Sequence, residues 1–73
     1  MVFRLLALAH RTQLVVKLQE IRRKYEGDPA KLALIDSLIN QLVMARSGPA
    51  YAFAMESLSE AAKVIPELRE LLG

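Results

Sequence analysis

The chain has 73 residues, with ten lysines and arginines against eight aspartates and glutamates, one histidine and no cysteine. This length suits one domain near the lower size limit for an unaided hydrophobic core, and the lack of cysteine excludes disulfides and thiolate chemistry. A net charge of +2 is too small to indicate nucleic-acid binding, while 53% hydrophobic residues exceed the usual share for a soluble domain. We therefore expect residues 1–73 to form a single small domain with surplus apolar surface.

The first predicted helix spans residues 2–25, and its two halves differ. In the second half, apolar side chains recur at helical spacing on one face, at Leu14, Leu18, Ile21 and Tyr25. That face extends back through His10, Ala7 and Phe3. The first half has a second apolar stripe on the opposite side, formed by Leu5, Leu8, Ala9, Thr12 and Val16, with Val15 at its margin. One straight helix cannot bury both sides in a small bundle, so the second stripe predicts an interface.

The second predicted helix spans residues 29–46. Gly27 is expected to end the first helix, Asp28 to cap the second and Pro29 to begin it. Its best core face holds Leu34, Ile35, Leu38, Leu42 and Ala45. A second stripe again carries surplus apolar residues, at Leu32, Ile39 and Val43, with Asp36 and Asn40 between them.

The third predicted helix spans residues 49–72, after Gly48 ends the second helix and Pro49 begins the third. Its core face is expected to hold Tyr51, Ala54, Met55, Leu58, Ala61, Ala62, Ile65 and Leu72. The apolar side is widened by Phe53, Val64, Leu68 and Leu71. Pro66 interrupts this pattern, because an interior proline removes one helical hydrogen bond and crowds the preceding turn. We expect a kink near Pro66, or a break followed by a short last helix.

Three helices joined by short turns predict an all-α, antiparallel up-down-up bundle. The first helix is mostly basic and the third mostly acidic, so we expect these two to be neighbours. In one hand of the bundle, the surplus stripes of the first two helices meet along their outer groove. In the other hand, both stripes turn toward the third helix. We adopt the first arrangement as the working prediction.

Enzymatic chemistry is not expected. His10 has no carboxylate or thiol on the adjacent helical turns, and Glu56 and Glu60 lie on a polar face without a Glu-x-x-His partner. No phosphate-binding loop, nucleophile elbow or zinc spacing is present, so we expect no cofactor and no metal. The first apolar run contains Arg4, His10 and Arg11 and lacks the pattern of a signal peptide or a membrane span, which fits recombinant expression in the cytoplasm.

The connections EGDPAK and RSGPAY, the Leu- and Ala-rich helices, the absence of cysteine and the ending AAKVIPELRELLG resemble a computationally designed three-helix mini-protein. The resemblance covers the whole chain but consists of style rather than a motif. Proteins of this kind are commonly made to bind a chosen protein surface with apolar anchors on one or two helices. The resemblance therefore implies a binder and assigns no functional residues.

The leading hypothesis is a monomeric binding module that docks its surplus apolar face onto a partner protein of unknown identity. The expected anchors are Leu5, Leu8, Ala9, Thr12, Val15, Val16, Leu32, Ile39 and Val43. The expected polar rim consists of Arg4, Arg11, Asp36 and Asn40. The alternative is a homodimer or oligomer that buries the same face. An amphipathic helix on a membrane surface and a small nucleic-acid-binding bundle are the remaining classes, and neither is expected.

Overall fold

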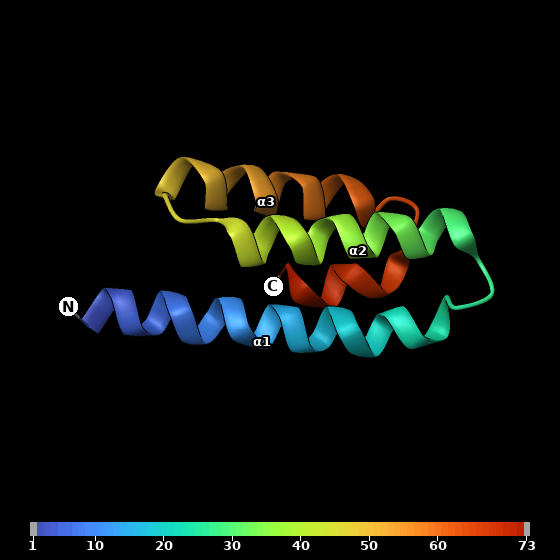
Figure 1. Ribbon diagram of the computed structural model, residues 1–73, viewed down its shortest axis with the longest axis horizontal. Coiled ribbons are helices and arrows are strands. Elements are labelled where there is room, and N and C mark those ends of the chain that lie inside the picture. The colour runs from blue at the N-terminus through green and yellow to red at the C-terminus, as the bar shows by residue number, and fades with distance from the viewer. Residues whose placement is uncertain (1, 73) are drawn as a thin grey trace.

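The computed structural model describes the backbone of residues 2–72 and the side chains of residues 10–72. Three long helices, α1 (Val2–Lys24), α2 (Pro29–Met44) and α3 (Gly48–Ala61), are followed by a short 3₁₀ helix, η1 (Pro66–Leu71) (Figure 1). No β-strand occurs in residues 2–72. The predictions of an all-helical chain and of three long helices are confirmed.

Local capping chemistry sets where α2 and α3 begin. The side chain of Asp28 accepts a hydrogen bond of 3.3 Å from the backbone amide of Lys31, as predicted for an N-cap. Ser47 repeats this arrangement at α3, where its hydroxyl accepts a 3.2 Å bond from the amide of Ala50. Each cap is followed by a proline in the first turn of its helix, where the missing amide proton costs no helical bond.

The predicted roles of the two turn glycines are wrong. Neither Gly27 nor Gly48 has a backbone angle φ in the left-handed region, so neither forms the expected glycine C-cap. Helix α2 ends at Met44 and its C-cap, Ala45, is extended. Gly48 instead lies in the first turn of α3, because Ser47 caps that helix one residue earlier than expected.

Pro66 breaks the third helix rather than kinking it. Helix α3 ends at Ala61, so the predicted continuous helix over residues 49–72 is wrong, and the alternative of a break with a short last helix is what occurs. Ile65 is extended, with φ −122° and ψ 90°, because the proline ring disfavours the helical conformation of the preceding residue. The amide of Ile65 still bonds to the carbonyl of Ala61 at 2.9 Å, which closes the turn between α3 and η1.

The break at Pro66 changes which elements are neighbours. Helix α1 packs against α2, α2 packs against α3, and η1 packs against both α1 and α3. Among the described residues, no Cα atom of α1 comes within 8 Å of one in α3, so the predicted direct pairing of the first and third helices is wrong. The reason is burial: Ile65 and Leu68 are both 0% exposed, and burying them draws the end of the chain into the space beside α1.

A single hydrophobic core joins all four elements. Its buried members are Leu14, Leu18, Ile21, Ile35, Leu38, Leu42, Ala54, Leu58, Ala61, Ala62, Ile65 and Leu68. Every one of them had been placed on an apolar face by its helical spacing. The spacing fails at the third helix, where Phe53 and Val64 are exposed and Leu72, predicted to be core, is exposed because η1 ends one residue before it.

Helix α1 is longer than its neighbours. The molecule measures 41 × 20 × 19 Å, and Figure 1 shows α1 along its whole length, with its first turns extending beyond the end of α2. The side chains of Phe3 and Ala7, predicted for the core face, lie outside the described side chains. The part of α1 that projects beyond α2 coincides with the most apolar part of the sequence.

Candidate docking surface

A shallow groove runs between α1 and α2 and is lined by Arg11, Thr12, Val15 and Val43. We call these four residues the α1/α2 groove. It encloses about 240 Å³ and is open to solvent. Val43 is 56% exposed, whereas Val15 is half-buried and packs against the core. The structure thus brings together four of the predicted site residues, three expected anchors (Thr12, Val15 and Val43) and one expected rim residue (Arg11).

Arg11 has a structural contact that the sequence did not predict. Its Nη1 atom donates a hydrogen bond to the backbone carbonyl of Ala45, 34 residues away, at the C-cap of α2. The last turn of α2 contains no basic residue, so the guanidinium of α1 supplies the positive charge that a helix C-terminus favours. Arg11 is therefore half-buried and committed to the fold, not a free polar rim residue.

The predicted rim residue Asp36 is also paired within the chain. Nε of Arg22 donates a 2.6 Å hydrogen bond to Oδ1 of Asp36, and Nη2 of Arg22 donates a 3.3 Å bond to Oδ2 of Asp36. The hydrogen bonds from Arg22 lower the pKa of Asp36, and the same bonds raise the pKa of Arg22 above its ordinary value. This bidentate pair ties α1 to α2, so Val15 and Val43 lie between two polar links, Arg11 to Ala45 and Arg22 to Asp36.

Val16 lies in a different hollow from Val15. It is 47% exposed and lines an open space of about 490 Å³ beside Leu71 at the end of η1. His10, Lys17 and Glu70 also line this space, and Thr12 borders both this hollow and the α1/α2 groove. The apolar surplus of α1 is therefore divided between two sides of the helix.

The other predicted site residues are scattered. Leu32 and Ile39 are half-buried, and Ile39 packs against the core. Asn40 is exposed. His10, expected near the edge of the core or at an interface, is exposed. Four predicted residues lie outside the described side chains, namely Arg4, Leu5, Leu8 and Ala9.

Sequence reasoning missed a second apolar surface, between α2 and α3. Its exposed members are Phe53 (63%) and Val64 (53%), which the helical spacing had assigned to the apolar side of the third helix. The sequence contained a signal for this surface. Helical spacing puts the apolar Phe53 and Val64 on one line along the helix with the polar Ser57 and Glu60. A core-facing line would not alternate in this way.

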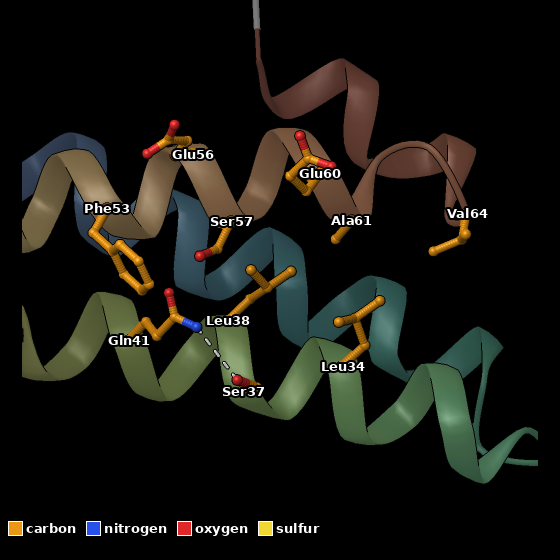
Figure 2. A pocket seen from close by; sticks show the side chains of 10 residues that line it. All are labelled: Leu34, Ser37, Leu38, Gln41, Phe53, Glu56, Ser57, Glu60, Ala61 and Val64. Atoms are coloured by element: carbon orange, nitrogen blue, oxygen red, sulfur yellow. Dashed lines mark hydrogen bonds between the residues drawn. The ribbon is translucent and has the colours of Figure 1, made fainter.

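This surface surrounds an open hollow of about 450 Å³, which we call the α2/α3 hollow. Figure 2 shows Leu34 and Leu38 of α2 across the hollow from Phe53 and Ser57 of α3 and from Val64, which lies in the turn after α3. Other lining residues include Gln41, Glu56 and Glu60.

Gln41 is the least satisfied polar side chain of this hollow. Its Nε2 atom donates a weak 3.4 Å bond to the hydroxyl of Ser37 (Figure 2). Its Oε1 atom is buried and has no hydrogen-bond partner in the described part of the chain. A buried acceptor without a partner destabilises a fold, and such atoms are uncommon in native proteins.

The described residues hold no group of three or more His, Cys, Asp or Glu side chains arranged to bind a metal ion. No described helix is both long enough and apolar enough to cross a lipid bilayer. The chain matches no family model, no curated protein and no solved structure.

Proposed function

We propose that the chain is a protein-binding module of the designed mini-protein kind, which docks one face of α1, joined by Val43 of α2, onto a partner protein. The observation that carries the proposal is the reach of α1. Its first turns extend beyond the end of α2 (Figure 1), and every residue in 2–9 except Arg4 is apolar. A helix that is apolar on most sides is stable in water only where another surface covers it.

The proposal includes an antiparallel up-down-up order of the helices. Arg11 meets Ala45, whereas Arg22, later in α1, meets Asp36, earlier in α2. Contacts that join rising residue numbers on one helix to falling numbers on the next support opposite directions for α1 and α2. In this order, the end of α2 lies alongside α1, and the first turns of α1 extend past it (Figure 1).

Binding would follow the usual division of a helix-mediated interface between a few anchors and their surroundings. Leu5, Leu8 and Val16 would enter the apolar surface of the partner, and each fully buried side chain contributes about 1.5–3 kcal/mol. Val43 would extend the contact onto α2. Arg11 and Asp36 hold the two helices together beneath this face, which pre-organises the anchors and lowers the entropy lost on binding.

The proposal is tested by probing an array of purified proteins with the labelled chain, with Leu8→Asp and with the control Ser59→Ala, an exposed position on α3. A partner should bind the wild type and the control equally, and should bind Leu8→Asp at least about tenfold more weakly, because one anchor is lost. The proposal is wrong if every protein that binds the wild type binds Leu8→Asp with the same affinity.

The alternative is a homodimer in which the same face of α1 covers its copy. Val16 and Val43 are exposed in the single chain, so a symmetric pair would cover them. Light scattering over a concentration series separates the two possibilities. A monomer at concentrations of about tens of micromolar would remove the homodimer as a functional state.

A further inference from the structure

The α2/α3 hollow offers apolar surface that none of the described side chains, residues 10–72, covers. Phe53 on α3 and Val64 in the turn after α3 are 63% and 53% exposed. Leu58, which lies between them in the sequence, is fully buried. Leu34 and Leu38 form the opposite wall on α2 (Figure 2). An exposed apolar patch of this kind, with polar groups at its edge, is typical of a binding site.

The outer edge of this hollow is acidic. Glu56 and Glu60 stand one helical turn apart on α3, and Figure 2 shows the carboxylate of Glu56 turned away from α2, on the solvent side. Both residues are exposed, and Nζ of Lys63 lies 3.2 Å from Oε2 of Glu60. Opposite charge at the edge of an apolar surface favours the encounter with a basic partner and sets its orientation.

The chain itself contains a helix with the complementary character. Residues 2–10, at the start of α1, include Arg4 and no acidic residue. The N-terminal part of this segment is almost wholly apolar and extends beyond α2 (Figure 1). Residues 2–10 form about 13 Å of helix, which matches the length of about 12 Å along α3 between Phe53 and Ala61.

We infer that the α2/α3 hollow binds the N-terminal part of α1 from a second copy of the chain. The two surfaces lie on different elements, and α1 does not approach α3 in the described part of one chain, so the contact forms between copies. Such a contact is head-to-tail: each copy offers a helix to one neighbour and a hollow to another. It grows into chains of copies unless it closes into a ring. The inference rests on the proposed function in one respect, because it takes α1 as the docking helix.

The test uses two variants that each remove one half of the contact. Glu56→Lys with Glu60→Lys reverses the edge of the hollow and leaves α1 intact, whereas Leu8→Glu alters the helix and leaves the hollow intact. Sedimentation velocity over a wide concentration range should show the wild type growing beyond two copies and each variant remaining monomeric. An equal mixture should form a one-to-one dimer, because one intact helix then meets one intact hollow. Glu20→Lys with Glu26→Lys, with the same charge change elsewhere, should associate like the wild type.

Circular dichroism first shows whether each variant is folded. If a variant is unfolded, an NMR dilution series of the wild type replaces it, and the Phe53 ring and the Gln41 side-chain amide should shift with concentration.

Three results overturn the inference: a wild type that stays monomeric throughout, a dimer that the double glutamate variant leaves unchanged, or Phe53 and Gln41 signals that do not move. A monomeric wild type leaves the proposed function standing, since α1 is then open to a foreign partner. Loss of the fold in Leu8→Ala overturns the proposed function instead.

Discussion

The hydroxyl of Tyr25 donates a 2.6 Å hydrogen bond to Oε1 of Glu67, and this contact joins the end of α1 to η1 across 42 residues of sequence. The bond lowers the pKa of Glu67 and raises the pKa of Tyr25, because it needs a charged carboxylate and a protonated phenol. Lys31 lies over the Tyr25 ring, 5.5 Å from its centroid. Tyr25 therefore holds the folded-back end of the chain against the first helix.

Tyr25→Phe should lower the melting temperature and reduce its dependence on pH. The pKa of Glu67 is lowered in the fold, so its contribution is present above its unfolded pKa and is lost as pH falls. The pKa of Tyr25 is raised, so its contribution is present below its unfolded pKa, about 10, and is lost as pH rises. Thermal melts followed by circular dichroism at acidic, neutral and alkaline pH measure both limbs.

Tyr51→Phe is the matched control. Tyr51 is also half-buried, but its hydroxyl makes none of the side-chain hydrogen bonds between elements described above. The Tyr25 assignment fails if both tyrosine variants lose the same stability at neutral pH.

Asp36→Asn should make the chain less sensitive to acid. Hydrogen bonds from Arg22 lower the pKa of Asp36 in the fold, so the stability that this pair supplies is present above the unfolded pKa, about 3.9, and is lost as pH falls through the folded value. The wild type should be the more stable protein at neutral pH, and the two melting temperatures should converge in acid. A constant difference across this range would show that Arg22 and Asp36 do not act as an ion pair.

Gln41→Leu should stabilise the fold by about 1 kcal/mol, because it removes a buried acceptor that has no partner and adds apolar contact at the α2/α3 hollow. The bond that is lost, to Ser37, is long and exposed. Urea unfolding measures the change. Ser37→Ala controls for the loss of that bond alone and should be nearly neutral; a destabilised Gln41→Leu would mean that the amide has a partner in solution.

Core and surface positions of α2 should separate cleanly in stability. Leu38 is 2% exposed, so Leu38→Ala should cost about 2–5 kcal/mol through lost burial and the cavity left behind. Val43 is 56% exposed, so Val43→Ala should change stability by no more than about 0.5 kcal/mol. Equal losses at the two positions in urea unfolding would contradict the burial assigned to α2.

Much of the fold follows from local rules. The Asp28 cap is set by chemistry within three residues, and the apolar spacing finds nearly every core position because it depends only on helix geometry. The return of η1 to α1 could not be predicted in this way. Pro66 explains why α3 stops, but the direction of the chain afterwards depends on where Ile65 and Leu68 find burial.

The candidate site was predicted less well, for the same physical reason. Arg11 and Asp36 look like free rim residues in the sequence, yet each has a partner on the other helix, 34 and 14 residues away. Val15 and Val16 are adjacent in sequence but line different hollows. Phe53 was placed on the apolar side of the third helix by its spacing, yet it is exposed because no described element packs over that side of α3.

The claim that the first half of α1 serves binding, and not the core, is tested most directly by the free energy of unfolding of Leu8→Ala beside that of Leu18→Ala. Leu18 is fully buried, so its truncation should cost about 2–5 kcal/mol. Truncation of Leu8 should cost no more than about 0.5 kcal/mol, because a docking residue contributes little to the isolated chain. If Leu8→Ala loses as much stability as Leu18→Ala, the apolar start of α1 is part of the core and the docking face does not exist.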